Sequence, residues 1–346
     1  MAREGRFSVN LIISDGKGEE TKDNVQIIDV GKPKNHFDRL FRINLKIFRT
    51  AAKINAAVYH FHDPELIPYV LLLRISGKKV VYDVHEDNAA LFRIKQYLPL
   101  ALRYTLAVVV TLLDKLAKYS FEIVLAGKFL KIKFPKGEVI LNYPIHSQFH
   151  YQNNKRENPR KYLLYTGTVS ESRGALQMAR MVRDIPDIEV FCIGKCSVQL
   201  ARKMIDIVGH EYNRLHIDGI ESYTLYEKIL ETYSVKEWLA GLALFHPMAI
   251  YMKSEPTKIF EYMAAGLPVI CSDFPKWNHL MHNCKVGITV NPYDIAEIRE
   301  AIDQLFLNSE LRNEMVHNGP LAVSSELNWK SEEKKLLGFY NKILNQ

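Results

Sequence analysis

The sequence has few cysteines and no long uninterrupted apolar run. Of its 346 residues only 4 are cysteine. All of them lie in the second half of the chain, at Cys192, Cys196, Cys271 and Cys284. Their spacing fits neither a zinc knuckle nor a redox Cys-x-x-Cys pair, so we interpret them as buried thiols in a reducing compartment. The most apolar stretch, 97–116, is interrupted by Arg103, Asp114 and Lys115, which argues against a membrane-spanning helix.

Acidic residues are scarce in the first half of the chain. Residues 1–150 contain 23 Lys/Arg against 15 Asp/Glu, a net charge of +8, whereas the rest of the chain carries −1 of the total of +7. This asymmetry predicts an anionic partner for the first half. No RNA- or DNA-binding motif accompanies the charge, so we expect no nucleic-acid partner and favour an anionic membrane surface. A solvated basic surface without a partner remains the alternative.

Short apolar runs alternate with helical patterns along the whole chain, which predicts parallel sheets built from β-α-β units. In the first half we expect strands at 8–14, 25–30, 57–61, 79–83, 123–125 and 139–141, and helices at 36–53, 64–75, 98–119 and 128–134. In the second half we expect strands at 162–165, 189–193, 214–217, 241–245, 269–272 and 287–290. Polar residues 152–161 form the natural linker, and a last helix over 329–344 follows a loop containing Gly319 and Pro320.

The segment 254–270 (SEPTKIFEYMAAGLPVI) is the most informative stretch. It predicts a helix that begins at Pro256 and ends at Gly266, followed at once by a buried strand. One face is apolar: Ile259, Phe260, Met263, Ala264 and Leu267. We expect the opposite face to hold Thr257, Lys258, Glu261 and Tyr262. A lysine and a glutamate one turn apart at a helix N-terminus suit a diphosphate and a ribose, although an ordinary amphipathic helix with one ion pair explains the spacing equally well.

The whole string resembles, almost letter for letter, the nucleotide-sugar signature of the family-four glycosyltransferases. The resemblance extends over the chain from about Phe7 and implies the retaining GT-B fold, which has two Rossmann-like domains facing a cleft and a C-terminal helix that crosses back to the first domain. It implies an acceptor-side domain over 1–155, a nucleotide-sugar-binding domain over 156–325 and the crossing helix over 326–346. Glu261 would hold the ribose hydroxyls of the donor.

The diphosphate of such a donor must be neutralised. The chain has no Asp-x-Asp pair, so we expect no metal and no cofactor, with fixed cations and helix amides in that role. The segment 167–174 (GTVSESRG) resembles the basic glycine loop of the family, with Gly167 and Arg173 in place, although Thr168 stands where the first basic residue belongs. Arg173, Thr257 and Lys258 would bind the diphosphate. Gly194 and Ile220 would border the nucleotide base.

In the first half, the strings His60-Phe-His-Asp-Pro64 and Tyr82-Asp-Val-His-Glu-Asp87 each end a strand at the edge where open α/β sheets bind ligands. The family carries its functional histidine in the second string, which implies that His85 lies beside the transferred sugar. We place His62 and Asp63 on the acceptor side, with a structural role for His62 as the alternative. A zinc site drawn from residues 60–87 is a further alternative that the ligand spacing does not diagnose.

Two departures from the family pattern bear on activity. Lys253 stands where the family has the first of two paired glutamates, and Glu255 replaces that carboxylate only if the loop shifts. We therefore take His85, Glu255 and Lys258 as the candidate catalytic residues. In addition, related enzymes have a strand, a glycine-bearing loop and a helix before a segment like 7–18, and we expect this first strand and helix to be absent.

These observations predict a metal-independent glycosyltransferase of the hexosyltransferase type, acting on a glycan or polyprenyl-linked acceptor in bacterial capsule, exopolysaccharide or O-antigen synthesis. The expected location is cytoplasmic, with peripheral attachment to the inner face of the cell membrane. The region 94–118 alternates cations with apolar runs, and either a core helix or a helix lying in the membrane interface accounts for it. Two other functions remain open: a catalytically inactive GT-B relative that serves as a binding or scaffold partner, and a sugar-nucleotide epimerase.

Overall fold

The computed structural model describes residues 7–95, 98–149 and 160–345 of the chain, and it divides into two compact α/β units. The first comprises 1–141 together with 333–346, and the second comprises 142–332. Most of the predicted linker and the segment before Phe7 lie outside the described residues. Within the described residues, no helix combines the length and the apolar character needed to cross a bilayer.

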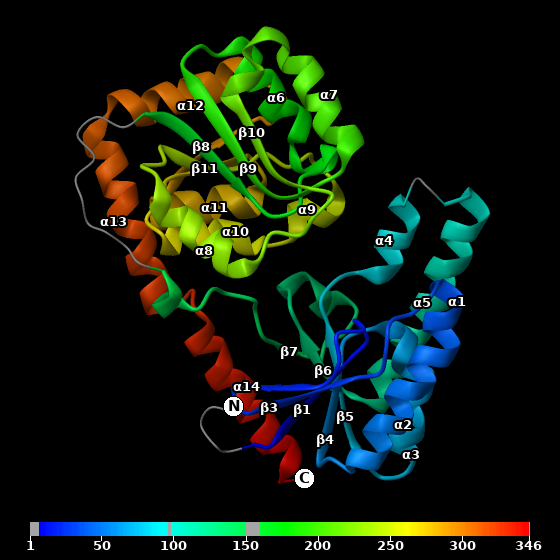
Figure 1. Cartoon of the computed structure of the whole chain (residues 1–346). Coiled ribbons are helices and arrows are strands. Elements are labelled where there is room, and N and C mark those ends of the chain that lie inside the picture. Colours follow the sequence, from blue (N-terminus) through cyan, green and yellow to red (C-terminus); the bar gives the residue numbers. More distant parts are fainter. Residues whose placement is uncertain (1–6, 96–97, 150–159, 346) are drawn as a thin grey trace. The chain divides into compact units, whose positions relative to one another are not determined.

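The first unit contains two sheets (Figure 1). One has the strand order β1-β3-β2 and the other the order β4-β5-β6-β7. The strands are β1 (Val9–Ile13), β2 (Glu20–Lys22), β3 (Val25–Asp29), β4 (Val58–Phe61), β5 (Lys79–Val84), β6 (Glu122–Leu125) and β7 (Glu138–Val139). β2 pairs with β3 in the antiparallel direction, and all other paired strands of this unit are parallel. The sequence pattern did not predict β2. The β2–β3 pair is a hairpin whose two-residue turn, Asp23 and Asn24, has positive φ angles of 52° and 64°, the backbone that tight hairpins require.

Helices cover these sheets. They are α1 (His36–Asp38), the π-helical turn η1 (Arg39–Ile43), α2 (Asn44–Ile54), α3 (Ile67–Ile75), α4 (Asn88–Ile94), α5 (Leu100–Ser120) and the last helix α14 (Trp329–Leu344). Short 3₁₀ turns follow β4 and β6, at η2 (Pro64–Leu66) and η3 (Lys128–Ile132), so the helix expected at 128–134 is a 3₁₀ turn. The sequence pattern did not predict α4. The end of α14 belongs to this unit, and the Nζ of Lys79 on β5 donates to the carbonyl of Leu344 at 3.1 Å.

The second unit has one parallel six-stranded sheet with the order β10-β9-β8-β11-β12-β13. The strands are β8 (Lys161–Thr166), β9 (Ile188–Cys196), β10 (Leu215–Ile220), β11 (Ala240–Ala243), β12 (Val269–Ser272) and β13 (Gly287–Val290). Each matches a predicted strand within a few residues. Three of the four cysteines, Cys192, Cys196 and Cys271, are buried in or beside this sheet and none is in a disulfide, as the spacing predicted.

Helices pack on both faces of this sheet (Figure 1). One face carries α6 (Ala175–Asp184), α7 (Val198–Val208) and α12 (Ile295–Leu307), and the other carries α10 (Thr257–Ala264), α11 (Pro275–Cys284) and α13 (Ser309–Ser325). The remaining elements are η4 (His146–Gln148), η5 (Glu171–Arg173), η6 (Gly209–Arg214), α8 (Tyr226–Val235) and α9 (Ala249–Lys253). One large apolar core fills this unit, and a separate core fills the first.

The loop predicted around Gly319 and Pro320 is wrong, because both residues lie inside α13. The reason is close packing. A Cβ at Gly319 would lie 2.6 Å from the carbonyl oxygen of Met263, so the glycine lets α13 approach the backbone of α10. Packing against a neighbouring helix outweighs the weak helix propensity of the two residues.

Candidate functional site

The strand ends of the second unit form a row of nested backbone turns. Gly167, Gly194 and Gly219 lie at the ends of β8, β9 and β10 and have φ angles of 91°, 147° and 100°. A Cβ at Gly194 would lie 2.2 Å from the carbonyl oxygen of Gly167, and one at Gly219 would lie 2.6 Å from that of Gly194. Side-chain carbons do not approach backbone oxygens so closely, so the turns nest only because Gly194 and Gly219 have no side chain, whereas a Cβ at Gly167 would meet nothing closer than 3.9 Å. This edge is where parallel sheets bind their ligands.

The strand order reverses between β8 and β11, and the loop after β8 leads directly into a helix. This loop contains η5, and Gly174 then adopts a left-handed backbone (φ 88°) before α6 begins. A Cβ at Gly174 would lie 2.2 Å from the carbonyl oxygen of Leu244, just after β11. The guanidinium of Arg173 lies 5.7 Å from the ring centre of Phe245. The predicted glycine loop is therefore held at the point of reversal, which is the usual ligand site of such sheets.

Lys258 lies at the same place, in the first turn of α10. Its side chain is 6% exposed, and its Nζ lies 3.4 Å from the ring centre of Tyr165 and 5.1 Å from that of Phe245. Among the described residues this buried Nζ has no hydrogen-bond partner. Burial, with a smaller contribution from the charge of Arg173, holds the pKa of Lys258 well below its usual value. A buried ammonium without a hydrogen-bond partner is costly, and the site is therefore suited to receive an anion that bonds it.

Glu261 lies one turn further along α10 and is held by a tyrosine. Its Oε2 accepts a hydrogen bond from the hydroxyl of Tyr233 at 2.9 Å. Burial raises the pKa of Glu261, against the opposing effects of that hydrogen bond and of the charge of Lys258. Tyr233 also contacts the hydroxyl of Thr166 at 3.2 Å, at the end of β8. Glu261 is thus fixed beside the strand-end turns, where a carboxylate can accept hydrogen bonds from two hydroxyl groups.

The predicted polar face of α10 is only partly correct. Tyr262 is fully buried, and its hydroxyl accepts a hydrogen bond from the backbone N–H of Thr166 at 3.0 Å. The tyrosine ring also lies against Gly241 of β11, where any Cβ would come within 2.4 Å of it. Tyr262 therefore belongs to the core, because its ring is apolar and its hydroxyl finds a buried partner. Thr257 is exposed at the start of the helix.

The other residues predicted near this helix have different surroundings. Glu255 forms an ion pair with Lys276 through Oε1 at 3.1 Å, and its Oε2 is buried without a partner among the described residues. Lys253 is exposed at the end of α9. Ile220 is 42% exposed at the end of β10. The carboxylate that we placed at Glu255 is thus already engaged by a cation.

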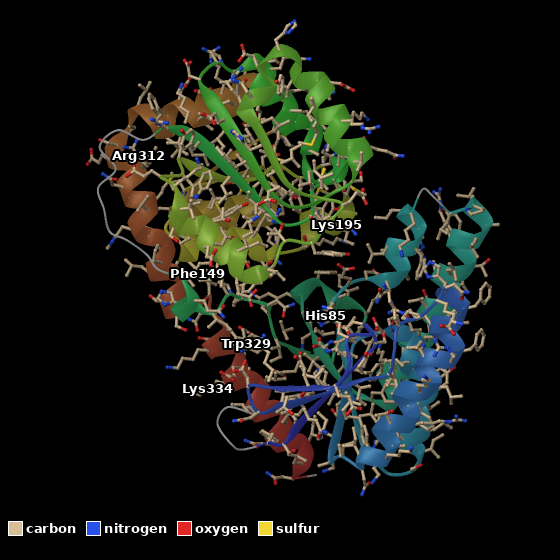
Figure 2. All side chains as sticks on the ribbon, in the orientation of Figure 1. His85, Phe149, Lys195, Arg312, Trp329 and Lys334 are labelled. Atoms are coloured by element: carbon tan, nitrogen blue, oxygen red, sulfur yellow. The ribbon has the colours of Figure 1, made fainter. Side chains whose placement is uncertain are left out.

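Several contributing residues were not predicted from the sequence. Tyr165 and Phe245 contact Lys258, and Tyr233 orients Glu261. The first two end buried strands, but an aromatic residue at such a position gives no signal distinct from ordinary core packing. A cavity of about 510 Å³ lies beside the glycine loop, lined among others by Ser170, Lys195 and Lys203. Figure 2 labels Lys195 at the end of β9, where its ammonium lies 4.3 Å from the ring centre of Tyr223.

In the first unit, three histidines surround one aspartate where β4 and β5 end. Asp83 Oδ2 lies 3.2 Å from His60 Nε2, 3.4 Å from His62 Nδ1 and 3.3 Å from His85 Nε2. His62 Nδ1 and His85 Nε2 are 2.9 Å apart. Figure 2 labels His85 in this unit. Although burial works against it, the three imidazole contacts hold the pKa of Asp83 well below its usual range, and the contact with Asp83 raises the pKa of His85.

The structure brings His62 and His85 together, whereas Asp63 is engaged by another residue. Asp63 is exposed and forms an ion pair with Arg39 at 3.1 Å. His60 was not predicted as a site residue, yet its ring completes the cluster and its Nδ1 hydrogen-bonds the hydroxyl of Tyr340 on α14. The signal for His60 is present in the sequence, because His60 and His62 are two residues apart and so share one face of a strand.

Comparison with known proteins supports a single family. Residues 147–321 match the profile of "Glycosyl transferases group 1". No curated protein sequence matches the chain. Among solved structures, sucrose-phosphate synthase from Thermosynechococcus elongatus is similar with a TM-score of 0.77 at 16% identity, over 99% of this chain and 90% of that one.

Two further structures are similar over most of their length. A glycosyltransferase from Rickettsia africae gives a TM-score of 0.65 at 15% identity, covering 93% of this chain and 86% of that one. HepE of Anabaena, in complex with UDP-glucose, gives a TM-score of 0.68 at 11% identity, covering 96% and 99%. At these identities the likeness shows the fold alone, and it confirms the predicted GT-B fold with two Rossmann-like domains.

Proposed function

The chain belongs to the glycosyl transferases group 1 family, and from this premise we propose that it transfers a hexosyl unit from a nucleoside diphosphate sugar to a glycan or polyprenyl-linked acceptor. We propose further that transfer retains the anomeric configuration, that no metal acts at the diphosphate, and that the reaction serves bacterial capsule, exopolysaccharide or O-antigen synthesis. The UDP-glucose bound to the similar HepE supports a nucleoside diphosphate sugar as donor.

One observation carries the proposal: the buried ammonium of Lys258 has no partner among the described residues and lies at the N-terminus of α10. Helix amides and the helix dipole favour an anion at that position, and a cation in a site shielded from water adds to the attraction. Arg173 supplies a second positive charge close to Phe245. In the proposed reaction these two cations neutralise the departing diphosphate, so that its charge develops against fixed positive groups.

The other residues have positioning roles in this proposal. Glu261 accepts the ribose hydroxyls, while Thr257 and the glycine loop that starts at Gly167 contact the phosphates; the N–H of Gly167 itself donates to the carbonyl of Ile193 at 2.8 Å. Gly194 and Ile220 border the base. In the first unit, His85 guides the sugar, with His62 and Asp63 on the acceptor side. Holding the reactants in register in this way accounts for a large part of the acceleration in group transfer.

The test is calorimetric titration of the purified chain with UDP, GDP and their common sugar conjugates. We expect one of these ligands to bind with one site per chain. Glu261→Ala and Arg173→Ala should each lower its affinity by about tenfold or more, because each removes hydrogen bonds to charged or buried groups. The matched controls are Glu300→Ala and Arg202→Ala, which alter exposed residues on α12 and α7. Unchanged affinity in both site variants would refute the proposed donor site.

A second function, a catalytically inactive GT-B relative that serves as a binding or scaffold partner, is favoured by one observation. Lys253 occupies the position of the first family glutamate, and Glu255 is paired with Lys276. Under this function the chain binds the donor but neither transfers nor hydrolyses the sugar. A single-turnover assay with radiolabelled donor and a panel of acceptors separates the active transferase from the inactive relative. If the chain is an enzyme, the wild type releases nucleoside diphosphate faster than the Lys258→Met variant; if it is an inactive relative, the two release it at the same rate.

Peripheral attachment to the cell membrane is also a proposal, and α5 supports it. This helix leaves a stripe of apolar residues exposed at four-residue spacing: Tyr104, Val108, Leu112 and Leu116. Arg103, Lys115 and Lys118 flank the stripe, within the half of the chain that carries a net charge of +8. Apolar side chains bordered by cations favour the interface of an anionic membrane.

Sedimentation with phosphatidylglycerol vesicles tests this attachment. We expect binding that weakens with salt and that falls about tenfold or more in the double variant Val108→Asp/Leu112→Asp, because carboxylates do not enter the apolar part of the interface and anionic headgroups repel them. The control is the same pair of substitutions at Ile205 and Tyr212, exposed apolar residues of the second unit. Equal binding of all three proteins would contradict the proposal.

A further inference from the structure

Three side chains of the first unit, His60, His62 and Asp83, have the spacing of a metal site. A tetrahedral ion with bonds of 2.0–2.1 Å separates its ligand atoms by about 3.3–3.4 Å. The Nε2 of His60 and the Nδ1 of His62 lie 3.2 and 3.4 Å from Asp83 Oδ2. The ligand atoms of all three residues lie within 4.8 Å of one another. One ion can therefore reach all three, while His85 lies beside them, 2.9 Å from His62.

Local structure explains why they converge. β4 and β5 are adjacent and parallel, with His60 paired to Val81. Because side chains alternate along a strand, the His-x-His pair at the end of β4 and the Asp-x-His pair at the end of β5 all emerge on one face. The sheet geometry therefore brings the two pairs together, although more than 20 residues separate one pair from the other in the sequence.

Hydrogen bonds leave part of this cluster unsatisfied. His60 Nε2 contacts Asp83 Oδ2 at 3.2 Å, and His62 Nδ1 contacts His85 Nε2 at 2.9 Å, where one nitrogen donates and the other accepts. Asp83 Oδ1, however, is buried with no hydrogen-bond partner among the described residues. A cation engages this carboxylate and accepts the lone pairs of His60 Nε2 and His62 Nδ1.

The outer contacts also suit a metal. A histidine that binds a metal through one ring nitrogen usually donates its other N–H to an oxygen, which fixes the tautomer. His60 Nδ1 makes such a contact with the hydroxyl of Tyr340. Tyr340 is itself held by the ring of Phe7, with the ring centres 6.2 Å apart. The side chains of His62 and His85 are 56% and 44% exposed, which leaves an entry path for an ion.

From this geometry we propose that His60, His62 and Asp83 bind one divalent transition-metal ion of the zinc class. Imidazole nitrogens with a single carboxylate are ligands that zinc prefers, whereas magnesium and calcium prefer oxygen ligands throughout. Three protein ligands leave one coordination position open, and the ion fastens the ends of β4 and β5 to α14 through Tyr340. The sequence analysis predicted no metal and kept a zinc site from residues 60–87 as an alternative, and this proposal takes up that alternative. It does not depend on the proposed transferase function.

Metal titration of the full chain tests the proposal without any sugar nucleotide. After dialysis against a chelator, the protein is titrated with Zn²⁺ in competition with a chromophoric chelator, and with Co²⁺, whose visible absorption is intense only in tetrahedral coordination. We expect one tight equivalent per chain and a tetrahedral Co²⁺ spectrum. His62→Ala and His60→Ala should each lower the affinity by more than about 100-fold, and Tyr340→Phe by about 10-fold.

Two controls separate the cluster from other zinc ligands. His210→Ala removes an exposed histidine of the second unit, and Cys284→Ser removes the one cysteine that is not buried; both should leave the tight site intact. His62 is more than half exposed, so its alanine variant should fold normally, which circular dichroism checks. Zinc binding that is equally tight in wild type and in His62→Ala, or a Co²⁺ spectrum of octahedral type, would overturn the assignment.

Discussion

Replacing Lys258 by methionine should stabilise the ligand-free protein and at the same time weaken nucleotide binding. Methionine is similar in length and apolar, and it can occupy the space beside Tyr165 and Phe245 that the lysine side chain fills. The substitution removes a buried positive charge that has no hydrogen-bond partner among the described residues. A core lysine would be expected to lose stability on replacement without any effect on binding, so opposite changes in stability and affinity separate a binding role from a packing role.

The magnitudes follow from the surroundings of the ammonium. Burying an unpaired ion costs several kcal/mol, and contact with an aromatic face at 3.4 Å returns about 2 kcal/mol of that cost. We therefore expect Lys258→Met to raise the free energy of unfolding by about 2 kcal/mol. For a unit the size of residues 142–332 this corresponds to a rise in Tm of about 4–8 °C. Loss of the charge-assisted contact with a phosphate should weaken binding about 10- to 100-fold.

The stability gain should depend on pH in a definite direction. Because burial lowers the pKa of Lys258 below the value of 10.5 expected in the unfolded chain, the unfolded state binds the proton more tightly. The stability of the wild type therefore rises with pH between the lowered pKa and 10.5. Lys258→Met carries no such proton, so its advantage should shrink over the same interval.

The assay combines urea unfolding at several pH values with calorimetric titration by the nucleotide that binds the wild type. Lys330→Met, at an exposed position, serves as the control and should change neither quantity. If Lys258→Met instead destabilises the ligand-free protein and binds the nucleotide as tightly as wild type, the lysine is a structural core residue and the reasoning is wrong.

Three further substitutions test other parts of the structure. Glu261→Gln should weaken UDP binding about tenfold but leave the affinity for inorganic diphosphate unchanged in calorimetry, because the carboxylate is assigned to the ribose alone. Gly194→Ala should lower the free energy of unfolding by about 3 kcal/mol or more in urea titrations, because its Cβ would lie 2.2 Å from the carbonyl oxygen of Gly167. The control is Gly209→Ala, which should lower it by only about 1 kcal/mol, because Gly209 has a positive φ of 69° but open space around it. Burial raises the pKa of Asp114 to about 6, so the folded state binds this proton more tightly than the unfolded state and loses stability as the pH rises from 3.8 through 6. Asp114→Asn should therefore leave the free energy of unfolding unchanged at pH 3.5 and raise it by about 2–3 kcal/mol at pH 8. Equal effects at both pH values would contradict the assignment.

Local sequence patterns predicted most of the helices and strands because each depends on residues close together in the chain. The helix from Pro256 to Gly266 illustrates this, since a proline, a glycine and an apolar face at helical spacing specify its ends and its orientation. The last helix, 329–344, was predicted to the residue. The hairpin at Asp23 and Asn24 was missed because β2 has three exposed polar residues and therefore no strand pattern.

The candidate site was predicted in part. Motif resemblance identified Arg173, Lys258 and Glu261, and the structure brings them to the strand ends of one unit. The assignment of Tyr262 to the polar face was wrong. A tyrosine can be buried when a buried group bonds its hydroxyl, and here the N–H of Thr166 does so. Tyr233, which orients Glu261, lies 28 residues away along the chain, and no local signal connects the two.

The sequence by itself determined the family, the alternation of strands and helices, and the short motifs at the strand ends, because all of these depend on neighbouring residues or on a contiguous string. Only the tertiary structure decided which strand ends lie side by side. Strand pairing places His60 beside Asp83, and close packing buries the Nζ of Lys258 with no hydrogen-bond partner among the described residues. Such contacts join residues far apart in the chain, and their free energies depend on distances and burial that no linear pattern records.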